Sequence, residues 1–116
     1  MAQHWGDAQP IYQQLRDRTV ARILASELTE GDALPSVRQL AVDLQINPIT
    51  VSRAYQLLVD ENLVEKRRGL GMFVNKGARQ QLLISEREQF IDQEWPKILD
   101  RIKQLDLEIE QLLKKA

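Results

Sequence analysis

The stretch that decides the fold is LPSVRQLAVDLQINPITVSRAYQLL, residues 34–58. Within it, Ser36 and Gln39 have the S-x-x-Q spacing of a capping box, in which each side chain bonds an unpaired donor at a helix start. Asn47 and Pro48 give a second start signal, an N-cap residue followed by proline at the first helical position. Each signal predicts a helix, and only about three or four residues remain between the end of the first helix and the start of the second. Two helices joined by so short a turn form a helix-turn-helix unit.

The helix that begins at Pro48 is predicted to reach about Glu61 and to bury one stripe. The side chains of that stripe are Val51, Ala54, Tyr55 and Leu58. At about 100° per residue, Ile49, Arg53, Gln56 and Asp60 lie on the opposite face, which is free to contact a partner. We expect Tyr55 to serve packing rather than binding.

The flanking segments complete a winged helix-turn-helix. A helix is predicted from Pro10 to about Ser26, because apolar positions recur there at three- and four-residue spacing. Glu30–Pro35 indicates a turn. The extended stretches 63–67 and 72–75 enclose Arg68-Gly69-Leu70-Gly71, which predicts a two-stranded hairpin. The expected fold is therefore mostly α, with three helices and a β-hairpin wing.

Residues 78–116 are predicted to form a second, helical domain after the winged helix-turn-helix domain of residues 1–77. Gln80–Trp95 and Pro96–Ala116 are compatible with helix, and Pro96 should break or kink the chain between them. A 21-residue helix over 96–116 would be about 31 Å long. Seven apolar residues follow a 4-3 spacing typical of a seam between two helices: Ile91, Trp95, Ile98, Ile102, Leu105, Ile109 and Leu112. This seam favours a homodimer over a helix that folds back on its own domain.

Composition excludes several other classes of protein. The chain has 116 residues, no cysteine and a single histidine, His4, which argues against disulfides, thiolate zinc sites, catalytic triads and multi-histidine metal sites. Neither a run of about 18 apolar residues nor a secretory signal is present. We therefore expect a cytoplasmic protein that is not an enzyme, with no cofactor, no metal and no membrane contact. His4 and Trp5 are assigned to a loosely held N-terminus without a role.

Four segments of the sequence resemble the DNA-binding domain of the GntR family of gluconate-operon-repressor-like regulators. They are residues 10–15, 31–41, 50–58 and the wing 68–74, and the resemblance spans roughly residues 8–76. The short helical tail resembles the YtrA-like subgroup. The resemblance implies that the tail serves dimerisation, and it suggests a repressor of a transporter operon.

The resemblance also implies several DNA contacts. Arg38 matches a backbone-contacting arginine of the family, Thr50 a DNA-contacting threonine, and Arg68 with Gly69 the wing that approaches the minor groove. Many members carry basic residues where this chain has Pro48 and Ser52, so base contacts from those positions do not transfer.

The position of a side chain on the helix face or the wing suggests further contacts. Arg53 is aimed to read a guanine in the major groove, or else it forms an ion pair with Asp60 or a neighbouring element. Ile49 touches a thymine methyl group or makes a tertiary contact, and the run Lys66-Arg67-Arg68 binds phosphates or protects an edge strand. The predicted DNA-binding residues are Arg38, Asn47, Ile49, Thr50, Arg53, Arg67, Arg68 and Gly69.

Together these features predict a sequence-specific DNA-binding transcription regulator, a homodimeric repressor that binds an inverted-repeat operator in double-stranded DNA. The alternative is a winged-helix protein–protein interaction module with a coiled dimerisation tail, since fold alone does not fix function. The identity of any small-molecule effector stays open.

Overall fold

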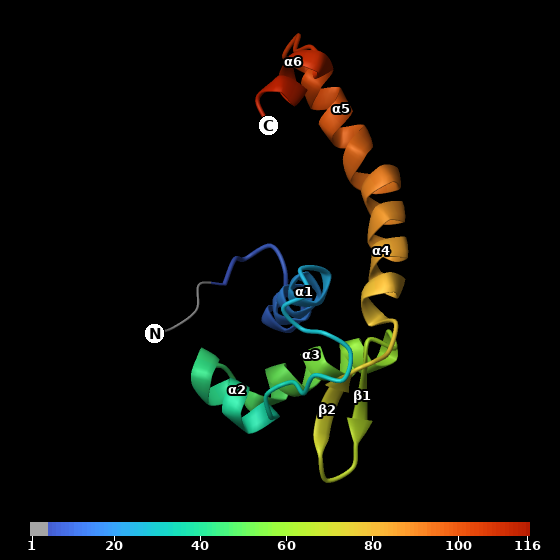
Figure 1. Cartoon of the computed structure of the whole chain (residues 1–116). Helices are drawn as coiled ribbons and strands as arrows, with labels where there is room; N and C mark the ends of the chain where they lie inside the picture. The colour runs from blue at the N-terminus through green and yellow to red at the C-terminus, as the bar shows by residue number, and fades with distance from the viewer. Residues whose placement is uncertain (1–4) are drawn as a thin grey trace. The chain divides into compact units, whose positions relative to one another are not determined.

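A computed structural model describes residues 5–116, so that His4 lies outside the described part of the chain. The chain divides into two compact units, a first that extends to Leu82 and a second of Leu83–Ala116. In order, the elements are α1 (Ile11–Leu24), α2 (Val37–Leu44), α3 (Pro48–Asp60), β1 (Val64–Arg67), β2 (Gly71–Val74), α4 (Ala78–Gln89), the π-helical turn η1 (Phe90–Glu94), α5 (Trp95–Gln104) and α6 (Ile109–Lys114) (Figure 1).

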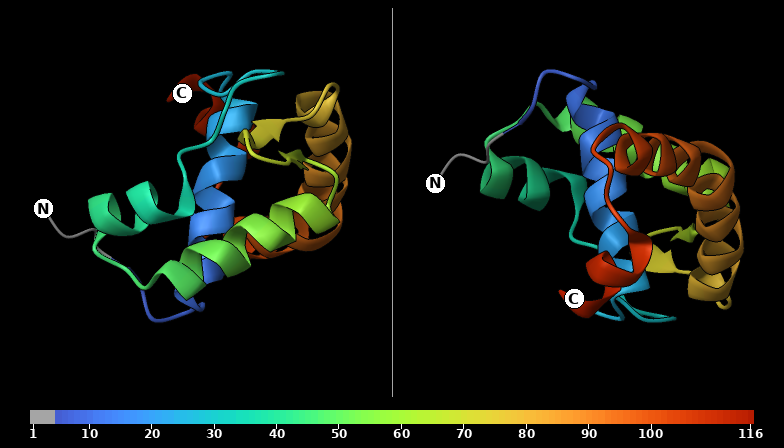
Figure 2. Two further views of the ribbon diagram at one scale, coloured as in Figure 1. Left: turned by 90° about the horizontal axis from the view of Figure 1, so that it is seen from below. Right: turned by 90° about the horizontal axis from the view of Figure 1, so that it is seen from above.

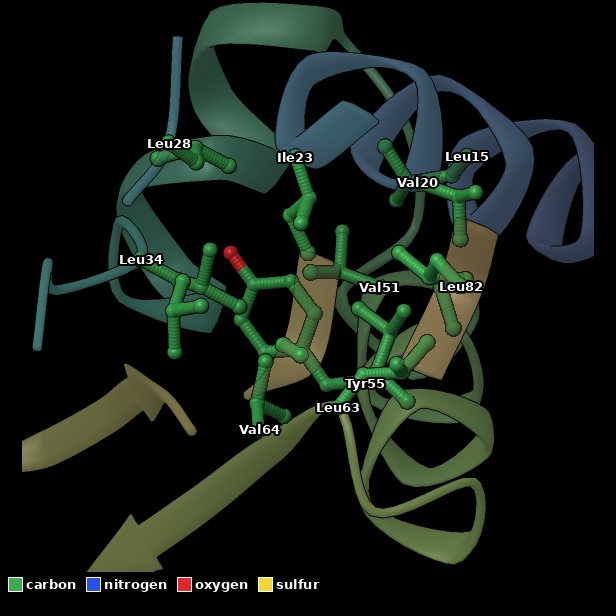
Figure 3. Close-up of a cluster of buried hydrophobic side chains, with 14 of the residues drawn as sticks. Leu15, Val20, Ile23, Leu28, Leu34, Val51, Tyr55, Leu63, Val64 and Leu82 are labelled. Carbon is green, nitrogen blue, oxygen red and sulfur yellow. The ribbon is translucent and has the colours of Figure 1, made fainter. Parts of the chain in front are cut away.

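The core of the first unit is built around α3. Its predicted stripe is confirmed, since Val51, Ala54 and Leu58 are completely buried and Tyr55 is almost so. Helix α1 packs across α3, as Figure 2 shows. It supplies buried side chains of its own, among them Leu15, Val20 and Ile23. In Figure 3, Tyr55 and Val51 lie among core side chains from α1, the hairpin and the start of α4.

The two predicted helix starts are confirmed, one of them in modified form. The Ser36 hydroxyl accepts a hydrogen bond from the Gln39 backbone N–H (3.1 Å), and Asn47 Oδ1 accepts one from the Ile49 N–H (2.9 Å). The reciprocal half of the capping box does not form, because the Gln39 side chain donates to Asp43 Oδ1 one turn further along α2 (2.7 Å).

The predicted hairpin is confirmed, and it is joined by the segment that precedes α2. Strands β1 and β2 are antiparallel, with Val64 opposite Val74 and Arg67 opposite Gly71. The Leu34 N–H donates to the Met72 carbonyl oxygen (2.8 Å), and an isolated bridge pairs Ala33 with Phe73. The stretch predicted as a turn therefore also extends the sheet, and this places the wing beside the start of α2.

Tyr55 ties α3 to that same segment. Its hydroxyl donates to the carbonyl oxygen of Pro35 (2.7 Å), and burial raises the pKa of the Tyr55 phenol to about 12. The ring fills the core while the hydroxyl satisfies a backbone acceptor, so the predicted packing role is confirmed.

Trp5 and Gly6, at the start of the described chain, are held more firmly than the sequence indicates. Trp5 is half-buried against the core, and the Arg18 guanidinium lies 3.9 Å from the centre of its ring. The Gln14 side chain also bonds both the N–H and the carbonyl oxygen of Gly6 (3.1 and 2.7 Å). The expectation of a loosely held Trp5 is wrong, because its ring packs against the core and stacks with the Arg18 cation on α1.

The tail contains one break more than predicted. The break near Pro96 is the π-helical turn Phe90–Glu94, and Pro96 itself lies in the first turn of α5. The helix predicted over 96–116 is wrong, because α5 ends at Gln104 and Asp106 adopts a left-handed φ of 52° before α6 begins. The 4-3 seam consequently does not run along one continuous helix.

The division between the two units falls later than the one predicted after Gly77. Ala78 and Leu82 are buried in the core of the first unit, so the first turn of α4 belongs to that unit. Within the described residues, no helix combines the length and apolar character needed to cross a membrane.

We expect Tyr55→Phe to have opposite effects on stability at neutral and at alkaline pH. Near neutrality the variant loses about 1 kcal/mol, because the Pro35 carbonyl loses its buried donor. In the parent, the Tyr55 phenol has a higher pKa in the folded chain than in the unfolded chain, so the unfolded chain loses its proton first as the pH rises. The free energy of unfolding of the parent therefore falls by on the order of 1–2 kcal/mol between pH 10 and pH 12. The variant lacks this loss. Denaturant unfolding at several pH values measures both effects, and equal pH profiles for the two proteins would contradict the assignment.

Candidate nucleic-acid interface

The outward face of α3 is uncovered in the described chain. Ile49 is 68% exposed, and Ser52, Arg53 and Gln56 are also exposed. The Gln56 amide donates to Asp60 Oδ1 (2.8 Å), which fixes its side chain along the helix. This face offers an apolar surface, a hydroxyl, an amide and a guanidinium, which are the groups that read base edges in a major groove.

Arg53 contacts α1 instead of Asp60. Its guanidinium carbon lies 4.1 Å from the centre of the Tyr12 ring, so the ion pair considered with Asp60 is wrong, and Asp60 is instead bonded by Gln56. The close packing of α1 on α3 explains this contact, since it brings a half-buried aromatic ring to the edge of the exposed face. A guanidinium stacked on a ring keeps its N–H donors in its own plane, where a bidentate acceptor can still be bound.

The start of α2 carries Arg38, which is exposed in the second position of the helix. Two other predicted residues are less free. Thr50 is half-buried, and Asn47 uses its side-chain oxygen to cap α3. Asn47 therefore has a structural role that is independent of any ligand.

The hairpin separates its cations between two faces. Side chains alternate along a strand, so Lys66 follows the buried Val64 on the face that looks toward α3. There Lys66 lines a groove of about 320 Å³ together with residues of α2 and the segment before it, of α3 and of β2: Pro35, Ser36, Val37, Ser52, Tyr55, Gln56, Gly71 and Met72. This groove joins the start of α2, the outward side of α3 and the wing.

Arg67 lies on the other face and is already engaged. Its Nε donates to Glu65 Oε1 (2.7 Å), and its guanidinium lies 4.4 Å from the centre of the Phe73 ring. Of the cations predicted on the wing, Arg67 is therefore the one least available to a partner.

The wing tip is a tight turn that only glycine satisfies easily. Gly69 and Gly71 have φ of 76° and 115°, and the Leu70 N–H donates to the Arg67 carbonyl oxygen (2.9 Å). A side chain on Gly69 would meet no atom within 4 Å, so the tip is open to an approaching surface. Arg68 is exposed beside it.

Two residues that line this groove, Lys66 and Gln56, are absent from the list of predicted DNA-binding residues, although Lys66 belongs to the basic run considered for phosphate contact. Lys66 could have been chosen over Arg67 by counting strand alternation from the buried Val64. Gln56 was placed on the correct face, but its amide was given no role. No group of three or more potential metal ligands occurs among residues 5–116.

The seven residues of the predicted seam are all exposed or half-buried in the single chain. Trp95, Ile98 and Ile102 share one face of α5, whereas Ile91 lies in η1 and Ile109 and Leu112 lie in α6. Exposed apolar residues outside the predicted seam include Ile84, Phe90, Leu107 and Leu113.

Comparison with known proteins agrees with this geometry. Residues 9–74 match the family model described as bacterial regulatory proteins, gntR family. The chain belongs to the GntR family. It is 38% identical over 78 residues to the transcriptional regulator YhcF and 39% identical over 74 residues to the transcriptional repressor YtrA, both of Bacillus subtilis. The resemblance drawn from the sequence, including the YtrA-like subgroup, is thereby confirmed.

The matches differ in how much of each relative they cover. The YhcF match spans 67% of this chain and 64% of YhcF, and the YtrA match spans 64% of this chain and 57% of YtrA, so the chain covers less than two thirds of either relative. A GntR family transcriptional regulator from Listeria monocytogenes has a similar fold over 97% of this chain and 99% of its own, with a TM-score of 0.78 and 28% identity. These relatives are transcription regulators rather than enzymes, as the sequence predicts.

The two faces of the wing lead to a matched pair of variants. Lys66→Ala should weaken DNA binding about equally for all sequences, because Lys66 faces the groove beside α3. The slope of log affinity against log salt concentration should fall in magnitude by about one, as expected for the loss of one phosphate contact. Arg67→Ala should have a clearly smaller effect, since Glu65 and Phe73 already hold its guanidinium. Titration of a fluorescent duplex at several salt concentrations measures both, and a larger effect of Arg67→Ala would show that the wing presents its other face.

Proposed function

We propose that this chain is a sequence-specific DNA-binding transcription regulator, a homodimeric repressor that acts in the cytoplasm on an inverted-repeat operator. The observation that carries the proposal is the uncovered face of α3, bordered by the start of α2 and the cationic wing. Membership of the GntR family supports the same function. By its likeness to the YtrA-like subgroup, we propose a transporter operon as the target.

In the proposed complex, α3 is the recognition helix and lies in the major groove. Arg53, held by Tyr12, donates to a guanine, while Ser52 and Gln56 face the neighbouring base edges. Ile49 supplies an apolar contact to a thymine methyl group. Thr50, at the edge of the helix, contacts the DNA backbone.

Cations outside the recognition helix bind the DNA backbone in this proposal. Arg38 contacts a phosphate from α2, and Lys66 does so from the wing. Arg68 and the open tip at Gly69 approach the minor groove. The net charge of the chain is −1, so these local cations, rather than a general excess of positive charge, supply the attraction.

The second unit supplies the proposed dimer contact. Its exposed apolar residues on η1, α5 and α6 have few partners within one chain, and a second copy would cover them. One recognition helix reads only a few base pairs, so pairing of two copies would double the site and make the operator an inverted repeat.

Selection of bound duplexes from random DNA by the full chain tests the proposed function. We expect an inverted repeat whose binding weakens steeply with salt. Arg53→Ala should lose about 1–3 kcal/mol and relax the preference at one position in each half-site, whereas Arg38→Ala should weaken all sequences alike. No enrichment over random sequence would favour the protein-interaction alternative. If both variants weakened binding to all DNA sequences alike, Arg53 would contact the DNA backbone rather than a base.

The tail has its own test. Ile102→Asp with Leu105→Asp places two charges per chain in the proposed interface, which is severely unfavourable if a second copy buries them. We expect a monomer by sedimentation whose affinity for the full operator is largely lost. Gln104→Asp, at an exposed position of the same helix, should stay dimeric. A double variant that remained dimeric would contradict this interface.

A further inference from the structure

The first turn of α4 is bound into the first unit by a buried stripe. Ala78 and Leu82 are 1% and 2% exposed, and the helix then continues as far as Gln89. Beyond Leu82 the residues of α4 belong to the second unit. One helix therefore begins in the core that carries α3 and ends in the unit that carries the exposed apolar residues.

Two polar side chains lie on opposite sides of that stripe. Viewed down the axis of α4, successive residues are rotated by about 100°. The side chains of Arg79 and Gln81 therefore leave the helix about 80° to one side and about 80° to the other side of the direction midway between Ala78 and Leu82. Both are exposed, so burial of apolar surface does not explain their placement.

Arg79 bonds the end of α1. Its Nε donates to the carbonyl oxygen of Leu24, the last residue of that helix (2.9 Å). The final carbonyl groups of a helix lack partners within it and carry the negative end of its dipole, so a guanidinium is a favourable partner there.

Gln81 bonds the end of α3. Its side-chain amide donates to the carbonyl oxygen of Glu61, the residue that ends this helix (2.7 Å). The carboxylate of Glu61 is in turn bound by Arg16 of α1, with 2.9 Å between Nε and Oε2. The same residue thus connects α1, the recognition helix and α4.

We propose that Arg79 and Gln81 are positioning residues for operator recognition. The buried stripe attaches α4 to the first unit, and the two hydrogen bonds on either side of it oppose rotation of α4 about its own axis. Helix α4 connects the first unit to the unit that carries the proposed dimer contact, so a rotation of α4 would change which spacing of half-sites the two recognition helices of a dimer reach together. This inference rests on the proposed function, and it adds the residues that make the dimer selective for one half-site spacing.

The test uses the full chain with Arg79→Ala and Gln81→Ala combined, and three kinds of duplex derived from the selected operator. The first carries one half-site, the second the complete operator, and the third the operator with one base pair added or removed between the half-sites. A single base pair rotates one half-site by about 35° relative to the other. Gln80→Ala, in the same turn and exposed, is the matched control, and Arg79→Lys is the conservative variant.

For the double variant we expect half-site affinity within twofold of the parent and an unchanged dimer mass. Affinity for the complete operator should fall about tenfold, as expected for the loss of two hydrogen bonds of modest net strength. The preference of the parent for the selected spacing over the altered spacings should shrink by a similar factor. Gln80→Ala should behave as the parent, and Arg79→Lys with Gln81 intact should retain most of the spacing preference.

Two results would overturn the inference. If the double variant kept the spacing preference of the parent, the two bonds would not set the direction of α4. If it lost half-site and operator binding in equal measure, the bonds would only stabilise the fold. A parent chain that bound no duplex at all would instead overturn the proposed function, and this inference with it.

Discussion

Burial of a single stripe of α3 is the constraint on which the rest of the molecule depends. Val51 and Leu58 are completely buried, and each such side chain contributes about 1.5–3 kcal/mol by leaving water. Because one buried stripe is enough to hold the helix, the opposite face stays exposed. A large binding surface is therefore available without removing any side chain from the core.

Polar contacts fix α3 at its start, near its middle and at its end. Asn47 caps its start, and near the middle Tyr55 bonds the segment before α2. At its end, Glu61 pairs with Arg16, whose pKa is raised above its usual value chiefly by this bond. The helix is thus held along its axis as well as against the core, which is what a surface that reads another molecule in register requires.

Aromatic rings hold several of the arginines at or near the exposed surface. Tyr12 lies under Arg53, Phe73 under Arg67 and Trp5 under Arg18. Stacking on Tyr12 leaves Arg53 with less conformational freedom to lose when it binds a partner, whereas Arg67 is also bonded to Glu65 and is less available. This arrangement is consistent with a chain whose net charge is only −1 and whose positive charges act locally.

Local signals in the sequence determined most of the first unit. The caps at Ser36 and Asn47, the spacing of Val51, Ala54 and Leu58, and the glycines of the wing each act within a few residues, so pattern alone predicts three helices and a hairpin. The outward face of the recognition helix follows from the same periodicity. Only tertiary structure decided that Arg53 stacks on Tyr12, because this contact depends on how α1 packs on α3. It also decided where the tail breaks and where the first unit ends, since a left-handed residue at Asp106 and the burial of Ala78 and Leu82 carry no periodic signal.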